Sequence, residues 1–450
     1  MAGAFKRKRG TGESRVRVDL SGTLATRVRG GGLADADLEA GRAAAAEAAA
    51  ALAKRRRAGG LPVAALAEGA GLKDVTGLAK DAAKRFDDLV VLGVGPGLGG
   101  VRALLDALGD GGAPVRGMRV HVADSLDPAA LVGLLGGLDL ARTLFNVVSR
   151  TGDSAENLSR FLVVRGRLLK ERGGVEYKQH VVITTDATAG ALRQIVNDEG
   201  FRALVMPAGL APRFAPLSAA GLFPAACAGF DVAAVVDGAA AMDERVRGDD
   251  PTANPALAHA LALHLGTAGG RAPGLAVVPC ADALAATAEW ARALAAWSGR
   301  GARVARLPLA PDDPPAGVHV FLRVDAAAVE VEVPRSYADL EAASYLGKQS
   351  LGALADLGRQ AAEVTLWQAG GLTTGIVCPS LAPHAVGQLF HLLALEAVFA
   401  RGLGGLDPAG EPAPAKGATP LAALAGRPGL EGARAEAQRL LAGREDDHVL

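Results

Sequence analysis

The sequence predicts an α/β protein built from two doubly wound parallel sheets. From about residue 75 onward, short and nearly continuous apolar runs rich in β-branched residues alternate with helical stretches. This pattern is typical of parallel strands buried on both faces. The alternation occurs twice, on either side of a polar, proline-containing segment at 240–255 that we interpret as a linker. A chain of 450 residues is long enough for two or three domains with cores of their own.

The boundaries that we expect divide the chain into four regions. They are an N-terminal tail and helical region at 1–74, a first α/β domain at 75–245, a second at 246–402 and a C-terminal arm at 403–450. The basic run Lys6–Arg9 is expected to be a solvated tail. An alanine-rich helix is expected at 34–57, where four cations in the last turn suit the helix dipole.

The strands and helices follow in order along the two α/β halves. In the first half, strands are expected at 88–94, 118–122, 144–148, 180–185 and 202–206, with helices at 101–108 and up to residue 169. In the second half, strands are expected at 275–278, 302–305, 319–324 and 375–378, with helices at 281–296, 350–362 and 384–401. Proline-rich loops are expected at 308–316 and 403–420, and a last helix at 429–443.

The composition narrows the class of protein. Lys and Arg number 48, as do Asp and Glu, so the net charge is zero, which argues against a general nucleic-acid-binding protein. Three scattered cysteines suit neither a disulfide framework nor a thiolate metal site. The chain shows no charge-free apolar run of spanning length and no signal-type apolar core at its N-terminus. We therefore expect a cytoplasmic protein that has no nucleic-acid or membrane partner and binds no metal.

Gly95–Gly100 satisfies the G-x-G-x-x-G pattern, follows a predicted strand and opens a predicted helix. Three interpretations stay open. In a chain with 59 glycines it could be a chance tight turn, it could be a phosphate or sugar loop, or it could be a nicotinamide site with Asp124 as the ribose ligand. Pro96 lacks a backbone N–H, which weakens an anion cradle.

Ser149–Ser154 lies between the third predicted strand and its helix, and it is rich in hydroxyl groups. Side-chain O–H groups, backbone N–H groups and the helix dipole together can bind a phosphate there. The same residues could simply cap the helix, with Ser154 or Asp153 as the cap. Asp153 argues against a phosphate because two anions repel each other.

Several segments resemble, in the same order, motifs of the glucose-6-phosphate isomerase family. They are the glycine loop 92–104, the loop 145–157, the strand end 184–186 and the segment 212–224, of which the last is the most specific. Shorter matches continue the order at 289–290, 370–371, 406–408 and 426–429. The collinear series runs from about residue 88 to residue 443, which is most of the chain.

The resemblance implies two sugar-isomerase (SIS) domains, each a doubly wound parallel sheet, and a homodimer. It also implies the interconversion of glucose 6-phosphate and fructose 6-phosphate, without a cofactor. After ring opening, a proton moves between C1 and C2 through an enediol. That step needs a carboxylate base, a cation near the enediolate and a phosphate cradle.

The resemblance places part of the family's site on residues of this chain. Arg213 takes the position of the active-site arginine. Phosphate binding is implied for the hydroxyl and glycine positions of the two loops, which are Ser149, Thr151, Ser154, Gly95 and Gly97.

The sequence departs from the family at the groups that move protons. Trp297 stands at the catalytic glutamate, Trp367 at the histidine and Ala418 at the lysine, with Lys416 two residues away as a possible substitute. No carboxylate in the segment 291–301 replaces the base. Three functions are therefore compared: an isomerase of this family, a non-catalytic homologue that binds a sugar phosphate or acts as a scaffold, and a nicotinamide-dependent enzyme.

Overall fold

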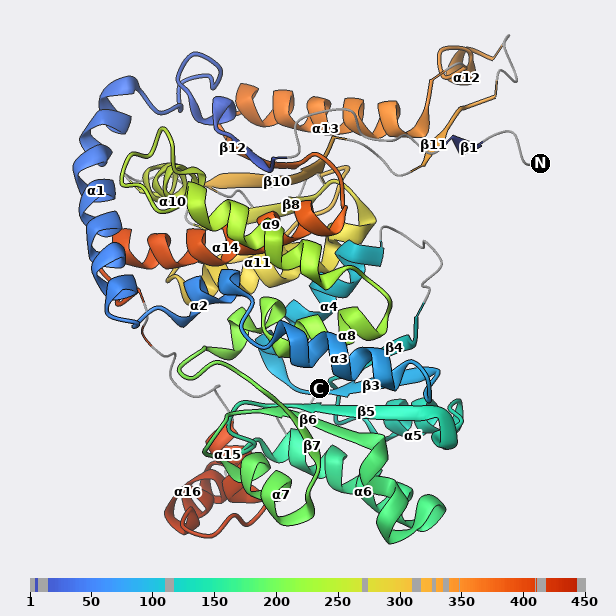
Figure 1. The fold of residues 1–450 in the computed structure, drawn as a ribbon. Helices are drawn as coiled ribbons and strands as arrows, with labels where there is room; N and C mark the ends of the chain where they lie inside the picture. The colour runs from blue at the N-terminus through green and yellow to red at the C-terminus, as the bar shows by residue number, and fades with distance from the viewer. Residues whose placement is uncertain are drawn as a thin grey trace. The chain divides into compact units, whose positions relative to one another are not determined.

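The chain forms two compact units, each assembled from segments that lie far apart in the sequence (Figure 1). Unit one comprises Met1–Asp81, Pro96–Met118 and Arg213–Gly410, and unit two comprises Ala82–Gly95, Arg119–Pro212 and Glu411–Leu450. The four-region division expected from the sequence stays a prediction. The computed structural model describes residues 5–6, 15–109, 117–268, 274–309, 317–325, 329–334, 340–347, 349–408, 410 and 418–442.

The sheet of unit two is entirely parallel. Its strands are β3 (Asp88–Leu92), β4 (Arg119–Ala123), β5 (Thr143–Val148), β6 (Val181–Thr185) and β7 (Arg202–Val205). They are ordered β4-β3-β5-β6-β7, so the strand order reverses between β3 and β5. Every residue of β3 and β6 is buried, as the apolar runs predicted. All five strands predicted for the first α/β half are confirmed.

The sheet of unit one has the order β2-β12-β10-β8-β9. Its parallel strands are β8 (Leu275–Pro279), β9 (Ala302–Val304), β10 (Val318–Val324) and β12 (Leu372–Cys378). They confirm the four strands predicted for the second half. The edge strand β2 (Arg17–Asp19) runs antiparallel to β12. A separate two-stranded sheet pairs β1 (Phe5–Lys6) with β11 (Glu330–Val331).

Strand β2 corrects two expectations. The sheet is mixed rather than wholly parallel, and Arg17–Asp19 belong to it instead of the N-terminal tail. Val16 is fully buried just before β2, and its backbone N–H donates to the side chain of Gln388. This segment covers what would otherwise be an open edge of β12. Arg7–Arg9 of the basic run lie outside the described residues.

Helices surround both sheets. Those of unit two are α5 (Pro128–Gly136), α6 (Ala155–Glu176), α7 (Ala191–Glu199), α15 (Ala418–Leu424) and α16 (Glu431–Ala442). Those mainly in unit one are α1 (Asp35–Arg57), α2 (Pro62–Ala65), α3 (Leu72–Ala82), α4 (Gly95–Gly109), α8 (Ala219–Cys227), α9 (Val232–Arg245), α10 (Pro255–Gly266), α11 (Ala285–Trp297), α12 (Glu341–Ser344), α13 (Leu351–Gln368) and α14 (Pro383–Leu403).

Two predicted boundaries change. Helix α4 begins at Gly95, six residues before the predicted start at 101, because the glycine motif itself is helical. The expected linker at 240–255 is helical up to Arg245, and Val235 and Ala239 of this helix are buried. The interpretation of the whole segment as a linker, which rested on its polar residues, is therefore wrong for its first part. Most of the predicted loop at 308–316 lies outside the described residues.

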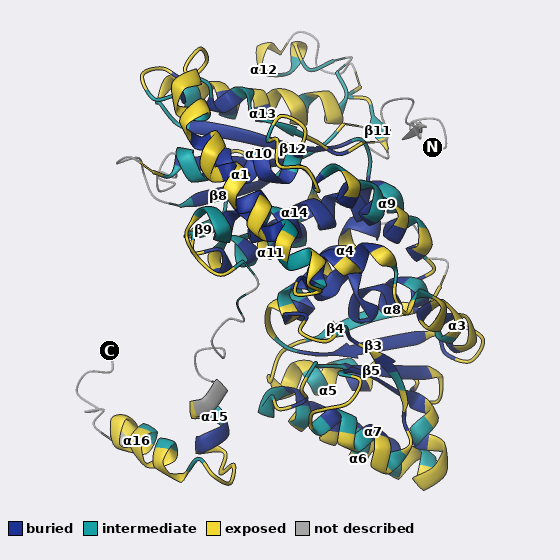
Figure 2. Ribbon diagram, turned by 60° about the vertical axis from the view of Figure 1, so that its left-hand side comes forward, coloured by how far each residue is buried: buried dark blue, intermediate teal, exposed yellow. Residues whose placement is uncertain are grey.

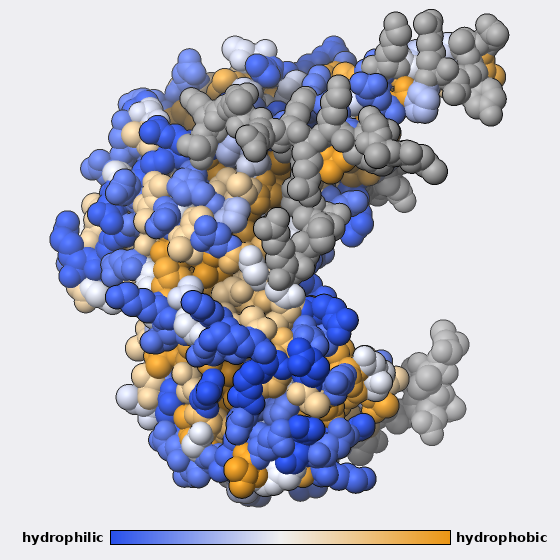
Figure 3. Space-filling view, turned by 45° about the vertical axis from the view of Figure 1, so that its right-hand side comes forward, coloured by the Kyte–Doolittle hydropathy of each residue, from blue (hydrophilic) through white to orange (hydrophobic). Residues whose placement is uncertain are grey.

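Helix α14 forms the centre of the unit-one core. Within the described residues it is the one helix long and apolar enough to cross a membrane, yet 78% of its most apolar stretch is buried inside the protein. It packs between α9 and α10, and Figure 2 shows it in dark blue, as it does β3 and β5. The face in Figure 3 carries both hydrophilic and apolar side chains.

Candidate functional site

Two loops of unit two follow the strands at which the sheet order reverses. The chain leaves β3 through Gly93–Gly95 and leaves β5 through Ser149–Ser154. In open α/β sheets, ligands bind beyond the carboxyl ends of the strands at such a reversal. The topology therefore brings the predicted glycine loop and the predicted phosphate loop to one edge of the sheet.

Arg160 of α6 holds this edge together from within. Its side chain is 2% exposed and donates to the carbonyl oxygen of Gly93, just after β3, at 2.6 Å and to that of Ala123, the last residue of β4, at 2.5 Å. It also donates to the carbonyl of Glu156 in its own helix. Burial lowers the pKa of the Arg160 guanidinium. The Arg160 side chain thus links helix α6 to the carboxyl ends of β3 and β4.

The loop after β5 is a tight, glycine-dependent turn. Gly152 has a φ of +75°, and a Cβ there would lie 2.5 Å from the backbone nitrogen of Leu192. Its N–H donates to the Ser149 hydroxyl oxygen at 3.0 Å. Thr151 is exposed, and no described residue bonds to its hydroxyl. Ser149 therefore braces the turn, while Thr151 is available to a ligand.

Ser154 caps helix α6. Its hydroxyl oxygen accepts from the N–H of Asn157 at 3.2 Å, and its O–H donates to Glu156 at 2.7 Å. Of the two caps considered from the sequence, Ser154 is confirmed, and Asp153 is exposed. The cap leaves other N–H groups of the first turn unbonded within the helix, and the dipole favours an anion there.

The glycine motif after β3 has two distinct structural needs. Gly95 has a φ of +66°, which favours glycine. In unit one, a Cβ on Gly100 would lie 2.5 Å from the ring of Pro216 and 2.9 Å from Nε1 of Trp290. Gly97 is buried in the first turn of α4. These constraints indicate that Gly95 and Gly100 are required by the structure, which argues against a chance occurrence of the glycine pattern.

In unit one, Arg213 lies in a cluster of cationic and aromatic groups. Its guanidinium carbon is 5.5 Å from the ring centroid of Trp297, and that of Arg401 is 4.4 Å away. Phe214 meets the same ring edge to face. Trp290 donates to the carbonyl oxygen of Arg213 at 2.8 Å and fixes its backbone.

The electrostatics of this cluster favour an anion. Burial, and then the nearby charge of Arg401, lower the pKa of Arg213 to about 10. Nε of Arg213 and Nε1 of Trp297 are both buried, and neither finds a hydrogen-bond acceptor among the described residues. Two cations with unused donors are suited to a phosphate or an enediolate.

Sequence comparison identifies the lineage. The family model described as phosphoglucose isomerase matches residues 74–306. The chain belongs to this family. A glucose-6-phosphate isomerase of Rubrobacter xylanophilus is 32% identical over 327 residues, which cover 70% of this chain and 76% of that protein. A probable glucose-6-phosphate isomerase of Natronomonas pharaonis is 34% identical, with 80% and 84% covered.

Two solved structures share the fold. A hypothetical protein from Thermus thermophilus superposes with a TM-score of 0.78 at 26% identity, covering 95% of this chain and 100% of that one. A glucose-6-phosphate isomerase from Chlamydia trachomatis superposes with a TM-score of 0.66 at 16% identity, covering 82% and 76%. The sugar-isomerase fold predicted from the sequence is confirmed.

The two tryptophans to which the resemblance gives catalytic positions have separate surroundings. Trp297 ends α11, is buried and contacts Arg213. Trp367 is half-buried on α13, donates to the Thr373 hydroxyl at 2.9 Å and lies under the guanidinium of Arg27. Its contacts anchor the segment after β2.

A buried pair of a carboxyl group and a guanidinium was not predicted from the sequence. Glu396 of α14 lies 3.7 Å from Arg300, and both side chains are about one-tenth exposed. Burial raises the pKa of Glu396 to about 7, although Arg300 opposes the shift. The available signal was the one carboxylate within the long apolar stretch 383–403.

The predicted residues thus fall into three groups. Ser149, Thr151, Ser154 and Gly95 lie in unit two, and Gly97 and Arg213 lie in unit one. Lys416 lies outside the described residues, and Ala418 begins α15. Among the residues that the structure describes, no group of three or more His, Cys, Asp or Glu could hold a metal ion.

Proposed function

We propose that this phosphoglucose isomerase homologue binds glucose 6-phosphate and fructose 6-phosphate and interconverts them only slowly. The single observation that carries the proposal is Trp297, which is buried against Arg213 at the position that the resemblance gives to the catalytic glutamate. The family and the phosphate loop favour substrate recognition. The missing carboxylate removes the group that would move the proton.

Phosphate recognition is assigned to the loop Ser149–Ser154. Thr151 offers an exposed hydroxyl, and the N-terminus of α6 offers backbone N–H groups and a favourable dipole. Relatives of 32% and 34% identity are named for glucose 6-phosphate as substrate. We therefore expect the 6-phosphate to bind here and not at an unrelated pocket.

The remaining chemistry is electrostatic. Isomerisation passes through an enediolate, and the resemblance gives the cation beside it to Arg213. Trp297 neither accepts nor donates the proton between C1 and C2. Loss of a general base typically lowers the rate by a factor of roughly 10²–10⁴. We expect a homodimer in the cytoplasm that acts on sugar phosphates of glycolysis and gluconeogenesis.

Two measurements on the purified protein test the proposal. Calorimetric titration with fructose 6-phosphate should show binding, and an assay coupled to glucose-6-phosphate oxidation should show slow turnover. Thr151→Ala should weaken binding, whereas Thr188→Ala, outside this loop, should not. Absence of heat at millimolar fructose 6-phosphate would leave the scaffold function in place of the binding function.

Efficient isomerisation is the second candidate, and Glu396 favours it. A carboxyl group with a pKa of about 7 is suited to general acid and base work at neutral pH. In that case turnover would be fast and would rise with pH through about 7. Glu396→Gln would abolish it, while the exposed control Glu289→Gln would not. Fast turnover that survives Glu396→Gln would contradict this second candidate.

A further inference from the structure

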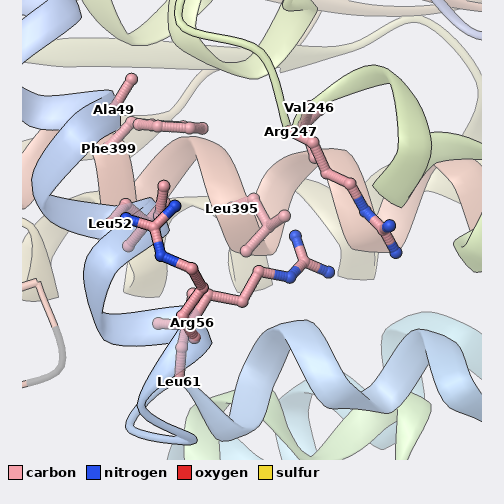
Figure 4. Close-up of a pocket in the computed structure, with 10 residues that line it drawn as sticks. Ala49, Leu52, Arg56, Leu61, Val246, Arg247, Leu395 and Phe399 are labelled. Atoms are coloured by element: carbon pink, nitrogen blue, oxygen red, sulfur yellow. The ribbon is translucent and has the colours of Figure 1, made fainter.

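A separate cavity of about 210 Å³ lies within unit one, between the end of α1, the segment after α9 and helix α14 (Figure 4). Pockets for drug-sized ligands are usually about 300–1,000 Å³, so this one suits a small metabolite. None of its lining residues is among those predicted for the sugar phosphate. One part of its wall is cationic and another part is apolar.

The cationic wall consists of Arg56 and Arg57 at the end of α1 and Arg247 beyond α9. Figure 4 shows Arg56 and Arg247 reaching toward each other past Leu395. Both donate to the same carboxylate oxygen, Oδ2 of Asp243. The shared carboxylate holds the two guanidiniums side by side at the cavity.

Asp243 is itself fixed from behind. It is 2% exposed, and Nε2 of the buried His391 lies 3.0 Å from its other oxygen. Burial raises the pKa of Asp243, but the hydrogen bonds from His391, Arg56 and Arg247 outweigh it and hold the pKa well below its usual value. The carboxylate is therefore charged at neutral pH, and the arginines have a permanent anchor.

The cavity keeps an excess of positive charge. The buried carboxylate of Asp243 pairs with two of the three guanidiniums, and Arg57 forms no ion pair with a described residue. A guanidinium has five N–H donors, of which Arg56 and Arg247 use only some on Asp243. The unused donors match the oxygens of a phosphate or a carboxylate.

The apolar wall is formed by Leu52 of α1 and by Leu395 and Phe399 of α14. All three are buried, which makes this surface part of the core of the unit. A sugar phosphate, which carries hydroxyls on every side, would leave this wall without a matching surface. A ligand with a hydrocarbon body would fit it.

We propose that this cavity binds a small organic anion. Its phosphate or carboxylate group pairs with Arg57 and Arg247, and its apolar body packs on Leu395 and Phe399. The proposal does not rest on the proposed isomerase function, because the two sets of residues are different.

Calorimetric titration of the full chain with phenyl phosphate and with benzoate tests it, and the tighter of the two identifies the head group. Inorganic phosphate has the anionic group without the ring, and phenol has the ring without the anionic group. Each should therefore bind at least about tenfold more weakly than the better of the two probes. Fructose 6-phosphate should not displace the bound probe. No binding of either probe at millimolar concentration, or equal binding of phenol, would overturn the proposal.

Arg57→Gln is the informative variant, because Arg57 is exposed and holds no structural ion pair with a described residue. It should weaken the better probe by about tenfold. Arg55→Gln is the matched control, since it removes the same charge from a nearby position that does not line the cavity. Arg213→Gln should leave the affinity of the probe unchanged. Equal weakening by Arg55→Gln, or loss of probe binding in Arg213→Gln, would contradict the assignment.

Discussion

At the scale of single residues, Trp297 decides how the site is interpreted. A tryptophan at this position keeps the arginines in place through its ring and contributes no proton acceptor. Burial and then the nearby charge of Arg401 lower the pKa of Arg213, while Arg401 donates to the carbonyl oxygens of Trp297 and Asp407. The positive charge of the cluster favours an anion, but Trp297 provides no group that could transfer a proton.

Trp297→Glu should therefore raise isomerase turnover by a factor of roughly 10² or more, because it restores a general base. Arg213 and Arg401 would pair with the new carboxylate and offset part of its burial. Loss of the buried indole costs about 3–5 kcal/mol, so circular dichroism should accompany the coupled assay. Trp297→Gln is the control and should show no gain. Equal rates for the two variants would show that position 297 is not the site of the base.

The raised pKa of Glu396 predicts a pH dependence of stability. The folded-state pKa is about 7 and the ordinary value is 4.5, so the folded protein binds more protons between these values. The free energy of unfolding should fall as the pH rises through that window, by up to about 1.4 kcal/mol per pH unit. Denaturant titrations at pH 5 and pH 7 give the free energy of unfolding at each pH. Between these pH values it should fall less in Glu396→Gln than in the wild type. Exposed Glu289→Gln should behave as the wild type; an equal fall in Glu396→Gln would contradict the prediction.

The sequence predicted where some candidate residues lie in the fold, for a physical reason. Ser149–Ser154 and Gly95 follow strands whose apolar pattern is unmistakable, so their place at the sheet edge follows from the topology. Glu396 could not be assigned in this way. Its role depends on Arg300, which lies 96 residues earlier, and no local pattern indicates a contact at that separation.

At the scale of elements, the N-terminus of helix α6 has a structural role, and we propose that it also binds the substrate phosphate. Ser154 stabilises the first turn as a cap, and the exposed Thr151 lies three residues before it. The two interpretations of the loop, capping and phosphate binding, thus apply to different hydroxyls.

Ser154→Ala should lower the free energy of unfolding by about 1 kcal/mol, because it removes the hydrogen bond to the N–H of Asn157. Thr151→Ala should leave stability within about 0.5 kcal/mol, because the hydroxyl is exposed. It should instead weaken fructose 6-phosphate about tenfold, through the loss of one hydrogen bond to a charged group. Denaturation and calorimetry on the pair check both effects, and the reverse pattern would contradict the assignment.

Elements with long apolar runs were predictable, and short ones were not. Strand β3 is five buried residues in succession, whereas β2 is three residues long and half-exposed. A three-residue strand has too little pattern to be distinguished from a loop. Its place is fixed by β12, more than 350 residues later, which no local reasoning reaches.

At the scale of the whole molecule, helix α13 is unusual because it buries charged side chains and exposes apolar ones. Its two buried residues are charged, Arg359 and Glu363, and they pair with each other. Leu357 is 51% exposed and Val364 44% exposed, and these two lie seven residues apart on the opposite face. An apolar face on a long surface helix is typical of an interaction surface.

We expect this face of α13 to contact a second copy of the chain in the homodimer. Light scattering should give about 91 kDa, twice the protomer mass of 45.4 kDa. Leu357→Glu with Val364→Glu should shift the protein toward the monomer, because charges placed in an apolar interface are costly to bury. Val175→Glu on α6 adds charge at a site 83% exposed and should leave the dimer intact. A dimer that persists in the double variant would place the interface elsewhere, and a wild-type mass of one protomer would refute the dimer itself.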